Sequence, residues 1–157
     1  MLILLDIDGV MVRANSWKKP EFMADGFPVF NSTSVKALQR ILSETGASIL
    51  LTTSHKTKYS VLKWRELLKS RDISPKSIHR LGTNSLTTSR KDEILEWYTK
   101  KHIPNEEFVI IDDDKMLNDL PDNIKNNVVL TSSSVGLTDD LADEAISILK
   151  KKSYQYV

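Results

Sequence analysis

Short apolar runs alternate with amphipathic segments along most of this 157-residue chain. Four runs predict buried strands at Leu2 to Leu5, Ser48 to Thr52, Phe108 to Ile111 and Val128 to Leu130. Continuous apolar strands are typical of a parallel sheet covered on both faces, because both sides of each strand are buried. The alternation with helical segments predicts an α/β fold with three layers around a Rossmann-like parallel sheet.

Apolar side chains recur at intervals of three and four between these strands, which predicts four helices. They are expected at about Ser34 to Glu44, at about Lys58 to Ser70, from Ser89 onward and from Thr138 onward. Thr33 or Ser34 would cap the first helix, and Gly46 would end it. The second helix would bury Leu62 and Leu68 among its apolar residues.

The segments Met11 to Ser32, Ser74 to Thr88 and Lys115 to Asn127 show neither pattern and are expected to be irregular. Residues 11–32 directly follow an acidic turn and carry several aromatic side chains. They can form a flap that serves as a minimal cap over a site. They can equally form a packed surface loop that its aromatics anchor to the core. The sequence leaves both interpretations open.

The composition predicts one domain over residues 1–157, long enough to bury a core of its own. The absence of cysteine excludes disulfides, thiolate metal ligands and a cysteine nucleophile. Net charge is +1, but basic residues outnumber acids between Lys56 and Lys101, where a polyanionic partner could bind. There is neither a secretory signal pattern nor an apolar stretch of membrane-spanning length, so a soluble, cytoplasmic protein without a membrane partner is expected.

Two acidic clusters follow apolar runs. Asp6 and Asp8 come after the first run and are followed by Gly9, while Asp112 and Asp113 come after the third. The carboxyl ends of parallel strands meet at one edge of a sheet, so these carboxylates should converge. Converging carboxylates repel one another unless a cation offsets them, and oxygen ligands favour Mg²⁺. The alternative is a pair of solvated acidic turns.

Hydroxyl groups and one lysine complete the candidate site. Thr52, Thr53 and Ser54 close the second strand, where their hydroxyls could donate to phosphate oxygens. Lys91 lies at the start of a helix, where its charge opposes the helix dipole unless an anion is close. Each of these features is common in proteins, so their value depends on their order along the chain.

The ordered set Asp6-x-Asp8-Gly9, Thr53, Lys91 and Asp112-Asp113 resembles the haloacid dehalogenase-like (HAD) superfamily of phosphatases and phosphotransferases. More narrowly, the chain resembles small HAD domains of bacterial and phage proteins, some of which are fused to RNA-repair modules. The segment from Leu130 to Thr138 and the helix after it fit that narrower pattern. The resemblance covers nearly the whole chain and implies the HAD-like fold with a minimal cap.

The resemblance implies a role for each matching residue. Asp6 would be the nucleophile that forms an aspartyl-phosphate, and Asp8 would be the general acid and base. Thr53 would bind the transferring phosphoryl group, with Thr52 and Ser54 as open alternatives. Lys91 would neutralise charge on the nucleophile and the phosphoryl oxygens.

The metal ion implied by the resemblance is Mg²⁺. Its ligands would be the Asp6 carboxylate, the Asp8 backbone carbonyl and Asp113, with Asp112 in support. Because dehalogenases of the superfamily lack this metal-site pattern, the acids favour phosphoryl chemistry over dehalogenation. The expected activity is therefore Mg²⁺-dependent hydrolysis of phosphomonoesters through an aspartyl-phosphate.

The substrate is predicted only by class. Neither the gap after the first motif nor the gap between the second and third motifs holds a full cap domain. The site should therefore be open to a small phosphate ester or to a nucleic-acid end. Thr53, Ser54, Lys91 and Arg13 are the expected substrate-binding residues. Further basic residues that could touch a substrate are Lys18, Lys19, His55, Lys56, Arg65 and Arg80.

Two other classes of function compete with a phosphatase. A receiver-type regulatory domain also gathers acids, a hydroxyl and a lysine around Mg²⁺, but there an acid pair precedes a lone phosphorylated Asp and the lysine comes last. The order in this chain differs, because the pair Asp6 and Asp8 comes first and a second acid pair follows Lys91. A non-catalytic binding module with the same fold is the other alternative.

Overall fold

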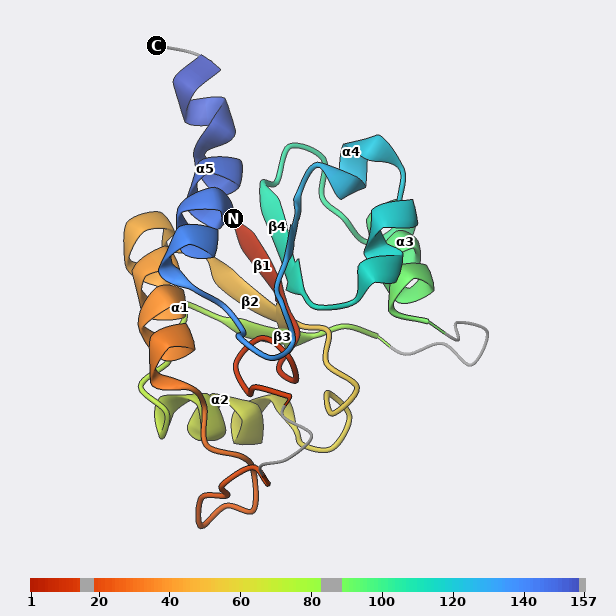
Figure 1. The fold of residues 1–157 in the computed structure, drawn as a ribbon. Coiled ribbons are helices and arrows are strands. Elements are labelled where there is room, and N and C mark those ends of the chain that lie inside the picture. Colours follow the sequence, from red (N-terminus) through yellow and green to blue (C-terminus); the bar gives the residue numbers. More distant parts are fainter. Residues whose placement is uncertain (15–18, 83–88, 156–157) are drawn as a thin grey trace.

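The computed structural model describes residues 1–14, 19–82 and 89–155, with side chains up to Lys151. Within these ranges, five parallel strands form a single sheet in the order β3-β2-β1-β4-β5 (Figure 1). The strands are β1 (Leu2–Leu5), β2 (Ser48–Leu51), β3 (Ile78–Arg80), β4 (Phe108–Asp112) and β5 (Val128–Leu130).

Helices cover both faces of this sheet. They are α1 (Ser32–Thr45), α2 (Val61–Lys69), α3 (Arg90–Lys100), the short 3₁₀ helix η1 (Lys115–Asp119), α4 (Asp122–Lys125) and α5 (Asp139–Gln155). One core joins α1, α2 and α5 to one face, and a second core joins α3, η1 and α4 to the other (Figure 1). The predicted three-layer α/β architecture is confirmed.

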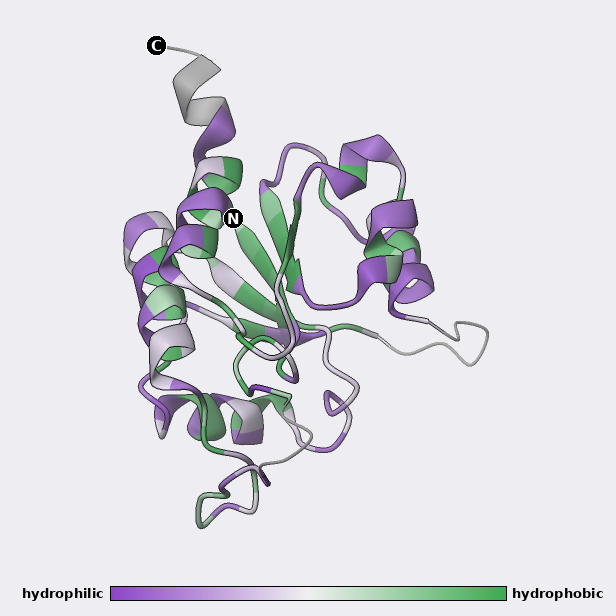
Figure 2. Ribbon diagram, viewed as in Figure 1, coloured by the Kyte–Doolittle hydropathy of each residue, from purple (hydrophilic) through white to green (hydrophobic). Residues whose placement is uncertain are grey.

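The two cores follow from the alternation of side chains along each strand. In β1, Ile3 and Leu5 belong to the core under α1, α2 and α5, whereas Leu4 belongs to the core under α3. All three side chains are fully buried, and the apolar colouring of the strands in Figure 2 continues onto the inner sides of the helices. None of the helices in the described residues is both long and apolar enough to cross a membrane.

All four predicted helices begin within three residues of the expected start, and α1 and α2 differ most. Helix α1 begins at Ser32 with Asn31 at its N-cap, so neither Thr33 nor Ser34 caps it. Ser34 is instead fully buried, and its hydroxyl donates to the carbonyl of Leu137 at 2.9 Å. Gly46 ends the helix as predicted, with a φ of 68° that favours glycine.

Helix α2 is shorter than predicted, and this changes the face that it buries. It begins at Val61 with Ser60 as its cap, whose hydroxyl accepts a hydrogen bond from the backbone of Lys63. Trp64 is buried on its inner face, whereas Leu62 is 72 % exposed. The prediction that Leu62 is buried was wrong, because the apolar stripe of α2 runs through Trp64 and the residues one helical turn after it, and Leu62 lies outside this stripe.

The segments expected to be irregular hold three further elements. Strand β3 lies inside the segment 74–88, and η1 and α4 lie inside 115–127. All three are five residues or shorter, which is too short for a periodic pattern of apolar side chains to stand out.

The loop before α1 is fixed to the end of α2 by a buried arginine. Arg71 is 5 % exposed and donates to the backbone carbonyls of Phe27 and Pro28 and to the carboxylate of Asp25. Phe27 and Phe30 are buried beneath its guanidinium, and each ring contacts it as a cation–π pair. Described residues of the segment 11–32 are thus anchored at these points, while Trp17 lies outside the described residues.

Candidate active site

The strand order places a crevice at the carboxyl ends of β1 and β4. The chain runs outward from β1 through β2 to β3 and then crosses back to β4, on the other side of β1. Open α/β sheets bind ligands where the strand order reverses in this way. Both acidic clusters of the sequence follow the two strands at this point.

The apolar runs of three neighbouring strands end in a polar residue at the same level. The backbone N–H of Thr52 donates to the carbonyl of Leu5 at 3.0 Å, and that of Asp6 donates to Ile111 at 3.1 Å. The pairing of β1 with β2 and β4 thus continues beyond Leu5, and Thr52, Asp6 and Asp112 lie side by side. By strand alternation they share the sheet face covered by α3.

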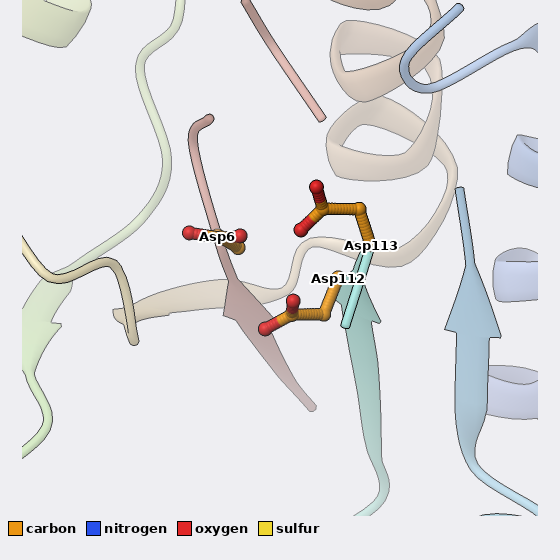
Figure 3. Close-up of side chains that lie close together, drawn as sticks. All are labelled: Asp6, Asp112 and Asp113. Carbon is orange, nitrogen blue, oxygen red and sulfur yellow. The ribbon is translucent and has the colours of Figure 1, made fainter. Parts of the chain in front are cut away.

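Asp6, Asp112 and Asp113 form a cluster of carboxylates (Figure 3). One oxygen atom from each lies within 4.8 Å of the others. Asp6 and Asp112 are buried, while Asp113 is half-buried. The cluster opens into a hollow of about 500 Å³ whose lining also includes Arg90, Asp114 and Lys115.

The turn after Asp6 lets Asp113 join this cluster. Gly9 has a φ of 80°, and a Cβ atom at this position would lie 2.0 Å from Oδ2 of Asp113. The same turn is tied to the end of β5, because the hydroxyl of Thr131 donates to the carbonyl of Gly9 at 2.7 Å. Glycine is therefore required at this position both by the backbone and by the carboxylate that passes over it.

Burial and neighbouring charges shift the pKa of two of these carboxylates. Burial, and next the charge of Asp112, raise the pKa of Asp6 to about 8, although Arg90 acts in the opposite direction. Burial also raises the pKa of Asp112 against the effect of Arg90. A cation bound here would stabilise the ionised form of these buried carboxylates.

Arg90 supplies part of the missing positive charge. Its Nη1 donates to Oδ2 of Asp112 at 2.6 Å and lies 3.4 Å from Oδ1 of Asp6. Ser89 caps α3 by accepting from the backbone of Asp92, and this places Arg90 in the first position of the helix. Arg90 shares the inner face of α3 with the buried residue Ile94, four positions on.

Lys91, which the sequence predicts for this role, is half-buried and lies one position further along α3. Successive helical residues differ by about 100° in direction, so Lys91 does not share the direction in which Arg90 reaches the cluster. Among the described residues no ion pair joins Lys91 to the carboxylate cluster. Sequence reasoning missed Arg90, although its helical spacing from Ile94 and Trp97 was a usable signal.

The hydroxyls at the end of β2 differ in their partners. Thr52 and Thr53 are both fully buried, whereas Ser54 is exposed. The hydroxyl of Thr53 accepts a hydrogen bond from the backbone N–H of His55 at 3.3 Å. The hydroxyl of Thr52 has no partner in the described part of the chain, although an unpaired buried hydroxyl is costly. Thr52 therefore has an unused donor beside Asp6.

Asp8 lies outside the carboxylate cluster, in the turn that follows β1. Its side chain is 57 % exposed, and its Oδ2 lies 2.8 Å from Nε2 of His55. The structure thus brings His55, a suspected substrate contact, to the residue expected to act as general acid and base. Only proximity in the fold links them, since 47 positions separate them in the sequence.

The other suspected substrate contacts lie away from the cluster. Arg13 donates to the carbonyl of Val135 at 3.3 Å and, with Lys19, lines a separate hollow of about 230 Å³. Lys56 is buried in an ion pair with Glu93 of α3 at 2.8 Å. The guanidinium of Arg80 donates to the carbonyl of Tyr59, Arg65 is exposed, and Lys18 lies outside the described residues.

Comparison with known proteins gives one family. The family model described as "HAD domain in Swiss Army Knife RNA repair proteins" matches residues 2–142. The matched segment contains all five strands and every residue of the carboxylate cluster. No curated protein matches the chain with significant similarity.

Proposed function

Since the chain belongs to the family of HAD domains in Swiss Army Knife RNA repair proteins, we propose that it is a Mg²⁺-dependent phosphomonoester hydrolase. Membership confirms the resemblance that its motifs predict and supports a phosphatase-like function of the HAD type. The observation that carries the finer proposal is the cluster of Asp6, Asp112 and Asp113 beside Arg90 at the reversal of strand order.

The residues present suit a magnesium ion. Three carboxylates offer hard oxygen ligands, and the Gly9 turn leaves room for one of them to approach the others. We assign Asp6 and Asp113 as ligands, together with the backbone carbonyl of Asp8, and Asp112 as their support. When bound there, Mg²⁺ would neutralise the carboxylates and polarise a phosphoryl oxygen of the substrate.

The proposed reaction has two steps. In the first, a carboxylate oxygen of Asp6 attacks phosphorus and the bond to the ester oxygen breaks, while Asp8 gives that oxygen its proton. In the second, Asp8 takes a proton from water, whose oxygen attacks phosphorus and releases Asp6. Asp8 is suited to both steps because it is exposed to solvent, whereas Asp6 is buried.

Arg90 and Thr52 support this proposal from the two sides of Asp6. Arg90 lies close enough to offset charge on Asp6, so we assign to it the neutralising role that the motif pattern gives to Lys91. For the phosphate-binding hydroxyl, Thr53 stays the prediction from sequence, and Thr52 is the competitor that the geometry favours. Single Thr→Val variants at the two positions separate them, because valine has the same shape without the hydroxyl.

The substrate that we propose is the phosphorylated end of a nucleic acid. The family takes its name from RNA repair proteins, and the carboxylate hollow is open rather than enclosed. The excess of basic residues between Lys56 and Lys101 supports a polyanionic substrate, although Lys56 itself forms an ion pair with Glu93. A small phosphate ester is the other substrate class that such a site can accept.

Phosphate release from a panel of phosphomonoesters tests the function. The panel contains RNA and DNA oligonucleotides phosphorylated at the 3′ or the 5′ end, together with p-nitrophenyl phosphate and small metabolite esters. We expect Mg²⁺-dependent release that EDTA abolishes reversibly and that Asp6→Asn abolishes outright. Asp119→Asn on η1 is the matched control, because that acid is exposed and should leave turnover unchanged.

The covalent intermediate is tested separately by acid quenching with substrate labelled in its phosphate. With labelled p-nitrophenyl phosphate, whose leaving group needs little help from an acid, Asp8→Asn should retain label on the protein, because the second step has lost its base, whereas Asp6→Asn should retain none. Release from oligonucleotide ends would support repair of nucleic acids. No release from any member of the panel would refute the hydrolase and favour a non-catalytic binding module.

A further inference from the structure

Asp8 is held by a residue from the end of a neighbouring strand. Its Oδ2 lies 2.8 Å from Nε2 of His55, in the turn that follows β2. An exposed aspartate otherwise moves among several staggered rotamers, and the side chain of Asp8 is 57 % exposed. The contact with His55 selects one direction for its carboxylate.

The imidazole is itself held from behind by buried aromatic residues. The His55 ring makes a T-shaped contact with Phe27, with 5.6 Å between centroids and 87° between planes. Phe27 is 2 % exposed and makes a second edge contact with Trp64 of α2. The ring of His55 is therefore placed by the core rather than by solvent.

The backbone of the same turn is fixed at two further points. The N–H of His55 donates to the hydroxyl of Thr53, and the carbonyl of Lys56 accepts from Nε1 of Trp64 at 3.0 Å. The side chain of Lys56 is buried and donates to Glu93 of α3 at 2.8 Å. An imidazole on such a turn offers the exposed carboxylate of Asp8 a fixed partner.

We propose that His55 is a positioning residue for Asp8, an inference that rests on the hydrolase proposed above. Nε2–H donates to Oδ2 of Asp8, and this hydrogen bond leaves Oδ1 for the substrate. Oδ1 then carries the proton that passes to the ester oxygen as the phosphorus–oxygen bond breaks. The same Oδ1 receives a proton from water when the bond between Asp6 and phosphorus is hydrolysed.

A positioning role of this kind depends on the leaving group. p-Nitrophenolate leaves with little help from an acid, whereas a phenolate or an alkoxide of high pKa requires its proton as the bond breaks. The parameter kcat/KM covers only the steps up to departure of the leaving group, so slow hydrolysis of the aspartyl-phosphate does not mask the effect. Loss of His55 should therefore steepen the dependence of kcat/KM on leaving-group pKa.

The experiment compares wild type, His55→Ala, His55→Phe and His55→Gln on substituted phenyl phosphates and glycerol phosphate with Mg²⁺. In the alanine and phenylalanine variants we expect losses below about twofold on p-nitrophenyl phosphate and of about tenfold or more on glycerol phosphate. Phenylalanine keeps the ring contact with Phe27 but lacks Nε2. Glutamine keeps an N–H donor and should recover part of the loss on glycerol phosphate.

Two controls separate positioning from other effects. His79→Ala removes an exposed imidazole on β3 and should leave the leaving-group dependence unchanged. In an Asp8→Asn background, His55→Ala should have little further effect, because His55 acts through Asp8. The melting temperature of each variant identifies any loss that comes from unfolding.

The outcomes distinguish this inference from the hydrolase itself. If wild type releases no phosphate from any ester, the proposed function fails. If wild type is active and the His55 variants lose rate equally on all esters, or not at all, the positioning role is overturned and the hydrolase stands. Equal behaviour of glutamine and phenylalanine at this position would also overturn it, because the hydrogen bond would then have no part.

Discussion

Replacing Asp6 by asparagine should stabilise the metal-free protein while abolishing its proposed activity. Asp6 is 5 % exposed and lies beside Asp112, and these two causes raise its pKa to about 8. Asparagine keeps the shape and can accept the hydrogen bond that the backbone N–H of Ile7 donates to Oδ1 at 2.9 Å. The substitution therefore removes the ionisable group and keeps the backbone contact.

The size and sign of the effect follow from the two pKa values. In the unfolded chain Asp6 loses its proton near its ordinary pKa of 3.8, but in the folded protein it keeps the proton until about pH 8. Stability should therefore fall as pH rises from about 4 to about 8, and it should be unaffected by this group below that window. At pH 7 the full effect would be about 4 kcal/mol, so after relaxation of the site we expect a gain of about 2 to 4 kcal/mol.

Denaturant unfolding in EDTA between pH 4 and pH 8 measures this effect. Wild type should lose stability across the range relative to Asp6→Asn, so that the two curves diverge towards pH 8. Asp119→Asn, at an exposed position on η1, should run parallel to wild type. If Asp6→Asn is no more stable than wild type at pH 8, burying the Asp6 carboxylate beside Asp112 carries no such electrostatic cost. Added Mg²⁺ should stabilise wild type and have little effect on Asp6→Asn.

Three further predictions concern other parts of the structure. Arg90→Gln should lower kcat by about a hundredfold or more in steady-state assays, whereas Lys91→Gln should lower it by less than about threefold. The reverse ranking would return the charge-neutralising role to Lys91. Gly9→Ala should weaken Mg²⁺ binding, measured by calorimetry, at least about tenfold. Gly26→Ala should not, because Gly26 has a similar φ of 79° but open space around it. The hydrogen bond from Arg71 lowers the pKa of Asp25 to about 2, so Asp25 should contribute about 1 kcal/mol to stability that is lost as pH falls from about 4 to 2. In Asp25→Asn the free energy of unfolding should depend less on pH over that range.

The sequence predicts the sheet well because the carboxyl-terminal ends of its strands are also the ends of apolar runs. Strands β1 and β5 have the predicted bounds, and β2 and β4 differ by one residue each. Three-residue β3 was missed because Ile78 is its only buried side chain, so neither an apolar run nor an alternation marks it. The pattern of parallel strands brings the carboxylates after β1 and β4 to the same edge of the sheet, and they meet there because the two strands are neighbours.

Side-chain direction is what the motif pattern left undetermined, and it separates Arg90 from Lys91 and Thr52 from Thr53. Each pair consists of adjacent residues of similar chemistry, so a motif that specifies one cation or one hydroxyl accepts either. Strand alternation puts Thr52 on the face of Asp6, and helical periodicity puts Arg90 on the face of Ile94. Both rules apply only when the register of the strand and the first residue of the helix are known, and in α3 the Ser89 cap fixes that first residue. A site built from short motifs is therefore best assigned by first locating caps and strand register and then asking which neighbour faces inward.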